Sequence, residues 1–295
     1  MRPVRRAKAR AEQGRNIKLI GLWLVIVGIG GGVGAAAWTM VNRPPDAFSL
    51  CESGSNIAAS SIMLVDATDA LTAIQKRRVK AAVETERDRL PYGGKLTIVT
   101  VNGADASQPI EVVSSCNPGK ASDNNPLFTT ASKVEKRWTD AFNGPVELAI
   151  AKASDGAVGA NSALIATIAA LLTRPDFDAR TPVRRLTIVS DMLEHVRGGY
   201  SHLAGGNFWK GYVNSPLPRL APLDLRGVSV AIDYLVRLQF AAVQGAAHRR
   251  FWRRLFGESG AKEVTFIGLA PPDADEDTEA AAPDKPPRHK PKSKG

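Results

Sequence analysis

The chain has 295 residues, a formal net charge of +10 at pH 7 and two cysteines, and 44% of its residues are hydrophobic. Seven basic residues and one acidic residue lie in positions 1–18. With Arg43 and a tail of five basic and six acidic residues (271–295) also set aside, residues 44–270 carry only +4. That balance is ordinary for a domain surface, so the charge argues against a nucleic-acid-binding protein and we expect no nucleic acid partner.

The first expected element is an uncharged apolar segment of 23 residues from Leu19 to Val41. At about 1.5 Å of helical rise per residue, this segment crosses a hydrocarbon core of roughly 30 Å. Basic residues crowd the sequence before it, whereas only Arg43 follows it closely. By the positive-inside rule we expect a single-pass signal-anchor at residues 19–41, with a cytoplasmic N-terminus and a periplasmic, extracytoplasmic main domain.

Two features of this segment leave alternatives open. Ala35, Ala36 and Ala37 are small residues of the kind found at a signal-peptide cleavage site, so the segment is either an anchor or a cleaved signal. Both alternatives export the rest of the chain. Five glycines lie between Gly28 and Gly34, and small residues allow close packing of spans, which offers a route to oligomerisation.

Cys51 and Cys116 are the only cysteines of the chain. In an exported domain, an even pair of cysteines indicates a disulfide rather than two free thiols. Closing a loop of that length stabilises a fold by about 4 kcal/mol in the chain-entropy model. We therefore expect a disulfide between Cys51 and Cys116.

Short β-rich apolar runs then alternate with helical patterns. The expected strands are Ser61–Val65, Lys95–Val101, Arg185–Val189, Val228–Ile232 and Glu263–Leu269, with a weaker one at Val146–Ile150. The expected helices are at residues 72–90, which open with the capping box Thr72 to Gln75, and at 131–142, 162–173 and 241–258. This order predicts an α/β fold with a Rossmann-like, doubly wound, mostly parallel sheet.

The expected organisation has five parts. They are a basic cytoplasmic segment (1–18), the transmembrane helix (19–41), a linker (42–60), the α/β domain (61–270) and a charged, proline-rich tail (271–295). The tail has an acidic stretch at 273–277 and later basic residues, and such a composition buries little apolar area, so we expect disorder there. Residues 196–222 form a stretch that is too long and irregular for a simple connection, which is typical of loops that are either functional or disordered.

Two of the expected strands are followed by an aspartate. Asp66 follows the strand at 61–65, with Thr68 two residues later, and Asp191 follows the strand at 185–189 after Ser190. Because the carboxyl ends of parallel strands meet at one edge of a sheet, we expect these side chains to lie close together. Carboxylate and hydroxyl oxygens suit a hard divalent cation, so the sequence predicts a site for Mg²⁺ or Mn²⁺.

In these motifs the chain resembles the von Willebrand factor type A (vWA) domain. That family's metal-ion-dependent adhesion site (MIDAS) combines an Asp-x-Ser-x-Ser motif, a threonine from a later loop and an aspartate after the fourth strand. Here Asp66 matches the first aspartate, Thr68 places a hydroxyl at the second position and Ala70 stands where the last serine belongs. Ser162 is the hydroxyl nearest to the threonine position, and Asp191 matches the last aspartate. The resemblance implies a vWA-like fold over about residues 58–270, and a degenerate site with Asp66, Thr68, Ser162 and Asp191 as metal ligands.

The resemblance also implies a protein-binding module of the adhesion or assembly type rather than an enzyme, because in this family an acidic residue of the partner completes the metal site. We expect a protein partner at or near the membrane. A second expected contact surface is the set of aromatic residues in the irregular stretch, since aromatic residues commonly anchor interfaces. These residues are Tyr200, Phe208, Trp209 and Tyr212. The alternative is an insertion folded onto its own domain.

An alternative function is a phosphohydrolase of the haloacid dehalogenase type. Asp66 would then attack phosphorus and Ser190 would hold the phosphoryl group. That family has a second aspartate where Thr68 stands, and no convincing acidic pair follows Val228.

The stretch His248–Phe256 carries aromatic residues on one helix face and arginines on the other. We interpret it as a helix packed on the sheet rather than on a membrane surface.

Overall fold

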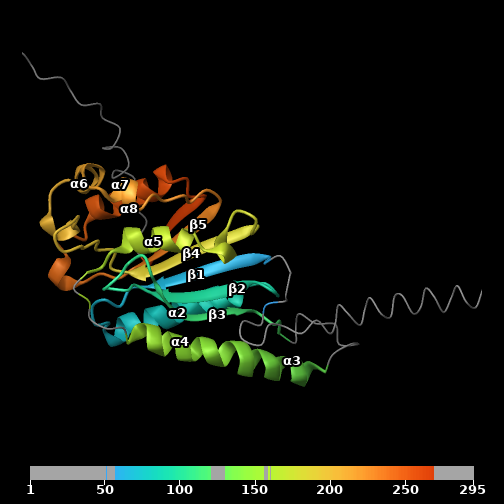
Figure 1. Cartoon of the computed structure of the whole chain (residues 1–295). Helices are drawn as coiled ribbons and strands as arrows, with labels where there is room; N and C mark the ends of the chain where they lie inside the picture. Colours follow the sequence, from blue (N-terminus) through green and yellow to red (C-terminus); the bar gives the residue numbers. More distant parts are fainter. Residues whose placement is uncertain (1–50, 52–56, 121–129, 156–158, 160, 269–295) are drawn as a thin grey trace, which may run out of the picture. The chain divides into compact units, whose positions relative to one another are not determined.

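The structure is a computed structural model, and it describes residue 51 and residues 57–120, 130–155, 159 and 161–268. These residues belong to one compact unit built on a six-stranded sheet of order β3-β2-β1-β4-β5-β6 (Figure 1). The strands are β1 (Ala59–Val65), β2 (Lys95–Thr100), β3 (Ile110–Cys116), β4 (Val183–Ser190), β5 (Val228–Tyr234) and β6 (Glu263–Ile267). The predicted α/β fold class is confirmed at this level.

Neighbouring strands pair in parallel except at one edge, where β3 runs antiparallel to β2. The five predicted strands other than the weaker one at Val146–Ile150 are all present, and each ends within two residues of its predicted end. All seven residues of β1 are buried, as expected for a central parallel strand covered on both faces. The chain order reverses between β1 and β4, so the sheet is doubly wound with its switch point there.

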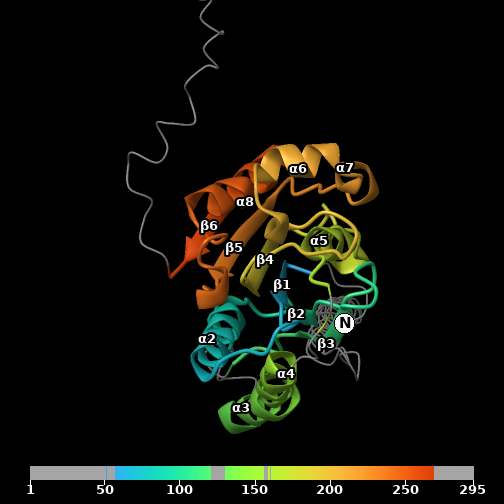
Figure 2. The same cartoon turned by 90° about the vertical axis from the view of Figure 1, so that its left-hand side faces the viewer.

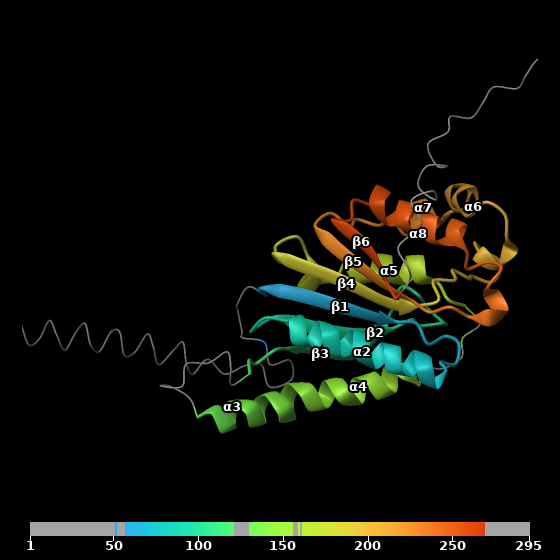
Figure 3. The same cartoon turned by 180° about the vertical axis from the view of Figure 1, so that it is seen from behind.

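Helices cover both faces of the sheet, as Figure 2 and Figure 3 show. On one face lie α5 (Leu164–Leu172), α6 (Phe208–Asn214), α7 (Leu217–Leu220) and α8 (Ala246–Glu258). On the other lie α2 (Ala73–Arg89), α3 (Ala131–Trp138) and α4 (Gly144–Ser154), with the π-turn η2 (Thr139–Asn143) between the last two. The predicted capping box of α2 is present, because Thr72 and Gln75 bond reciprocally at 3.3 and 3.0 Å.

The prediction of a weak strand at Val146–Ile150 is wrong, because these residues lie inside α4. Pro145 stands in the first turn, where its missing N–H costs nothing. The buried residues Val146, Ala149, Ile150 and Ala153 then recur at helical spacing against the sheet. The short apolar run fitted a strand and a helix equally well, and only the longer spacing distinguishes the two.

Strand β3 was missed by the sequence analysis. It is an edge strand that begins with exposed residues, and it returns antiparallel to β2 through a short connection, so its sequence lacks the continuous apolar run of a central strand.

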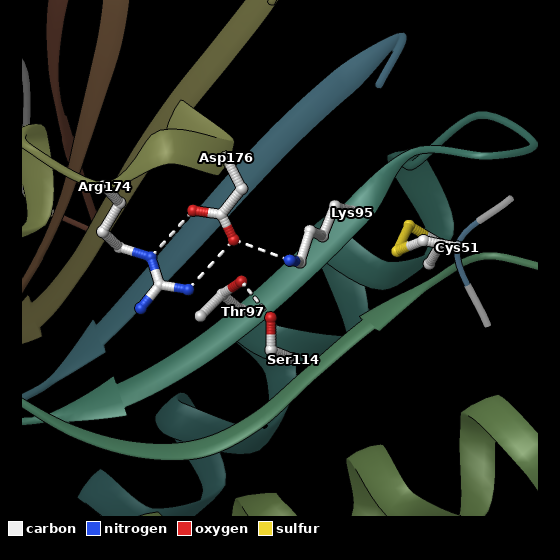
Figure 4. The surroundings of a disulfide bond; sticks show 7 residues. Cys51, Lys95, Thr97, Ser114, Arg174 and Asp176 are labelled. Carbon is white, nitrogen blue, oxygen red and sulfur yellow. Dashed lines mark hydrogen bonds and ion pairs between the residues drawn. A yellow bond between two sulfur atoms is a disulfide. The ribbon is translucent and has the colours of Figure 1, made fainter. Parts of the chain in front are cut away.

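The predicted disulfide is confirmed at the end of β3, where Cys116 is bonded to Cys51 with the Cα atoms 4.9 Å apart (Figure 4). Near it, Asp176 pairs with Lys95 at 2.7 Å and with Arg174 at 2.9 Å.

The irregular stretch at 196–222 folds into short helices, the 3₁₀ turn η4 (His202–Ala204), α6 and α7. The remaining 3₁₀ turns are η3 (Pro175–Phe177) and η5 (Leu238–Phe240).

In the part of the chain that the structure describes, no helix combines the length and apolar character needed to cross a membrane. The predicted basic segment, the transmembrane helix with its glycines, most of the linker and the tail lie outside the described residues.

Candidate functional site at the carboxyl ends of the strands

The candidate site lies where β1 and β4 end side by side at the centre of the sheet. Their parallel register joins Val65 to Val189, so the residues that follow each strand emerge at the same edge. Asp66 continues this pairing, since its backbone N–H donates to the Val189 carbonyl at 2.9 Å. The switch point of a doubly wound sheet is where such folds bind ligands.

Asp66 is the acceptor at the centre of three hydroxyl groups. Its Oδ1 accepts from Thr68 Oγ1 at 2.7 Å and from the Thr68 backbone N–H at 3.1 Å. Its Oδ2 accepts from Ser162 Oγ at 3.0 Å and from Ser190 Oγ at 2.9 Å. Asp66 is only 3% exposed, so these four bonds replace the water that its carboxylate would otherwise hold. The structure thus brings the predicted Asp66, Thr68 and Ser162 together.

Asp191, the fourth predicted ligand, lies next to this group but is bound to different partners. Its Oδ1 accepts from the Leu193 backbone N–H at 2.9 Å, and its Oδ2 forms an ion pair with Arg237 Nε. Burial, together with the negative charge of Asp66, raises the pKa of Asp191 to about 6, although Arg237 opposes this shift. Met192, directly after it, has the left-handed φ of 60°, a strained conformation that is frequent at functional sites.

Arg237 is the residue of the site that the sequence analysis missed. It follows β5 and is 8% exposed, and its backbone N–H donates to Gln244 Oε1 at 2.7 Å. Gln244 Nε2 in turn donates to the Asp191 and Leu235 carbonyls at 2.9 Å each, which fixes the loop after β5 against the loop after β4. No motif marks Arg237 in the sequence, because only the β4–β5 pairing brings this loop to Asp191.

The residues as they lie do not fit a divalent metal ion. Both Asp66 oxygens are filled by hydroxyl and N–H donors, and Arg237 already supplies a positive charge to Asp191. The guanidinium Nη1 also lies 3.5 Å from the carbonyl oxygen of Ala70, the position where the vWA motif has its last serine. Among the described residues, no group of three or more His, Cys, Asp or Glu side chains is arranged to hold a metal. A divalent ion would have to displace the arginine.

A small depression opens beside this cluster, with a volume of about 130 Å³. Thr68, Ser162, Asp191 and His195 line its polar side, and Leu203 and Phe240 belong to its apolar side. The His195 Nδ1 lies 2.8 Å from Ser201 Oγ, and the His195 backbone bonds to Ser162, so the ring is held at the mouth of the depression. The depression can therefore accept a small polar group.

Behind the depression lies a fully buried polar group. Glu194 is 0% exposed and accepts from the Ile165 backbone N–H at 2.9 Å, and burial raises its pKa to about 8. The Glu194 backbone N–H donates to His202 Nδ1 at 3.2 Å, and His248 links His202 to Tyr234 over 2.9 and 2.6 Å. Burial lowers the pKa of His202 to about 2 and that of His248 to about 4, so both are neutral.

The four aromatic residues predicted as partner contacts lie together on the α8 side. Tyr212 is buried at 7% exposure, and Tyr200 donates its hydroxyl to the Phe208 carbonyl at 2.8 Å. All four pack on the core that contains Phe251, which is the arrangement of an insertion folded onto its own domain. Phe208 and Trp209 remain partly exposed and line a separate groove.

The phosphohydrolase alternative gains no support from this geometry. Asp66 is 3% exposed and both its oxygens already accept hydrogen bonds, whereas a nucleophilic carboxylate needs a free oxygen directed at the substrate. The cation nearest to the pair of aspartates is Arg237, and it is bound to Asp191. That alternative stays a prediction from the sequence.

Comparison with known proteins assigns no function. No protein-family model and no curated protein matches the chain. Fourteen chains of solved structures match. One is the crystal structure of the SpRpn10 VWA domain, which is 12% identical, with 77% of this chain and 96% of that chain covered and a TM-score of 0.38.

Proposed function

We propose that the chain is a membrane-anchored, vWA-like protein-binding module whose contact face is the carboxyl-terminal edge of the sheet. The observation that carries the proposal is a polar depression with exposed apolar residues beside it. Leu203, which lines the depression, is 40% exposed, and Leu238, next to Arg237, is 91% exposed. Large apolar side chains grouped in water around a polar centre are typical of a protein contact surface.

Further apolar residues come from the loops at the same edge. Ile74, at the start of α2 after β1, is 64% exposed, and Val236, directly after β5, is 48% exposed. The segments that follow β1, β4 and β5 thus each contribute at least one of these residues. Loops held by a rigid sheet are where binding residues concentrate, because they vary without disturbing the core.

In this proposal the partner is bound without a bridging metal ion. Arg237 compensates the charge of Asp191, and the hydroxyls compensate Asp66. Recognition then depends on the apolar residues and on hydrogen bonds to groups such as Ser162 and His195. This differs from the mode that the family resemblance implies, in which an acidic residue of the partner completes the metal site.

The experiment uses the full-length chain in its native membrane, with a photo-crosslinking amino acid in place of Leu238. We expect covalent capture of a discrete partner, and loss of that capture when Leu203→Asp is added. The matched control places the same crosslinker at Leu148, which is 75% exposed and belongs to helix α4 rather than to the segments that follow β1, β4 and β5. No capture from the Leu148 position is expected.

Equal capture from both positions, or none from Leu238, would overturn the proposed contact face. Turnover of a generic aryl phosphate by the full chain, lost in Asp66→Ala, would favour the phosphohydrolase instead. A variant that folds as the wild type but captures less partner after Ser162→Ala would identify the depression itself as part of the contact.

A further inference from the structure

A groove of about 810 Å³ lies between the start of α6 and the outer side of α8, which run side by side in Figure 1 and Figure 2. Phe208 and Trp209 line it from α6, and Arg250, Arg253 and Arg254 line it from α8. It shares no lining residue with the depression at the strand ends. Its volume is in the range of clefts that bind ligands or short peptide segments.

The charge in this groove is of one sign. The described residues that line it include three arginines and no carboxylate. Arg254 is stacked over Trp209 with its guanidinium carbon 3.9 Å from the ring centroid, and it also pairs with the exposed Glu258 at 2.7 Å. Arg250 is exposed and, within the described chain, makes no hydrogen bond or ion pair. Stacked guanidinium groups keep their in-plane N–H donors free for carboxylates.

The chain carries an acidic segment that can reach this groove. Residues 273–277 read Asp-Ala-Asp-Glu-Asp, and they follow β6, whose Phe266 lies 5.2 Å from the Arg253 guanidinium. Five to nine extended residues after Gly268 span roughly 17–30 Å. The 13 residues of α8 extend over about 20 Å, so the segment reaches any point along the helix.

We propose that the acidic segment 273–277 of the same chain binds in the groove between α6 and α8. Its carboxylates pair with Arg250, Arg253 and Arg254, and Ala274 faces the apolar wall. An outside protein then reaches this groove only by displacing the tail. The proposal rests on the groove and on the acidic segment, and it is independent of the function proposed for the strand-end face.

The test is disulfide trapping in the full-length chain. Ala274→Cys is combined with Ala247→Cys, which is at the groove, and the pairing is read by mass spectrometry after mild oxidation. The matched control combines Ala274→Cys with Leu148→Cys on the opposite face, where the side chain is 75% exposed. We expect a several-fold higher yield for the groove pair, because a disulfide needs Cα atoms within about 7 Å.

A second arm tests the charges. Replacing Asp273, Asp275, Glu276 and Asp277 by their amides, or Arg250→Gln together with Arg254→Gln, should lower the groove yield to that of the control. Arg219→Gln on α7 serves as the matched control for removing an exposed arginine. Raising the salt to about 1 M, where the Debye length is roughly 3 Å, should also lower the yield.

Equal yields for Ala247→Cys and Leu148→Cys would overturn the proposal, as would a groove yield that is unchanged by the amide substitutions. Crosslinks only between two molecules would assign the occupant to the tail of a second copy. If only added acidic peptide, or only vesicles of anionic lipid, protects Ala247→Cys from a thiol reagent, the occupant is an outside protein or a membrane, and the tail is excluded.

Discussion

Arg237 combines burial with a direct bond to the charged cluster. Its Nε pairs with Asp191 while Gln244 holds its backbone, and only 8% of the residue is exposed. The guanidinium of Arg237, in the loop after β5, compensates the negative charge of Asp191, as a bound cation would otherwise do. Burial and the charge of Asp66 both raise the pKa of Asp191, and the charge of Arg237 opposes this rise.

We predict that Arg237→Met destabilises the protein by roughly 3–5 kcal/mol, because breaking a buried ion pair leaves a buried charge without a partner. The free energy of unfolding in urea measures this change. The double variant Arg237→Met with Asp191→Asn should lose less stability, since it removes both charges.

We also predict that divalent ions do not stabilise the wild type. Its melting temperature should be the same in Mg²⁺ or Mn²⁺ as in EDTA. A clear rise with either ion would restore the metal site to consideration.

Glu194 gives the site a pH dependence of its own. In the folded state, burial raises the pKa of Glu194 to about 8, above its ordinary value of 4.5. The folded protein therefore binds a proton between these two pH values that the unfolded chain has already released. Stability from this group is fully present below pH 4.5, falls as the pH rises and is lost once the pH has passed about 8.

We predict that Glu194→Gln removes this loss. The melting temperature of the wild type, measured from mildly acidic to mildly alkaline pH, should fall relative to that of the variant as the pH increases. The control is His195→Gln, because His195 directly follows Glu194 in the chain but is partly exposed. This variant should show the same dependence of melting temperature on pH as the wild type. Parallel profiles of the wild type and Glu194→Gln would show that Glu194 is not the titrating group.

At the scale of the elements, the sequence predicts what depends on local pattern. The strands β1, β2, β4, β5 and β6 were predicted because each contains a short β-rich apolar run, and these runs alternate along the chain with helical patterns. The edge strand β3 was missed because it begins with the exposed Ile110 and Glu111 and includes two serines, which leaves only a short apolar run. Residues 146–150 of helix α4 were predicted as a strand because their four apolar residues fit both periods.

The candidate site also contains residues that the sequence predicted and one that it missed. Asp66, Thr68 and Asp191 follow strands whose ends the sequence located, so their proximity was predictable from the sheet. Arg237 was not, because its loop has no motif and its approach to Asp191 depends on where β5 lies beside β4. The aromatic residues of α6 were predicted as contacts from composition alone, and composition does not tell an exposed aromatic residue from one packed on its own core.

At the scale of the whole molecule, the uneven charge gives the last prediction. The first 18 residues hold seven of the 39 basic residues, directly before an uncharged stretch of 23 residues. An anchored chain with that flank keeps its first residues in the cytoplasm and exports the domain that holds the Cys51–Cys116 disulfide.

We predict that the full chain stays in the membrane fraction through an alkaline carbonate wash, whereas a chain without residues 1–43 does not. Alkaline phosphatase fused to the C-terminus should be active, because that enzyme needs an exported, oxidising compartment. The mass of the intact protein separates the two alternatives for the segment, since a cleaved signal leaves a chain that begins near Ala37. Release of the uncleaved full chain by carbonate would rule out the anchor, and with it a contact face held close to the membrane.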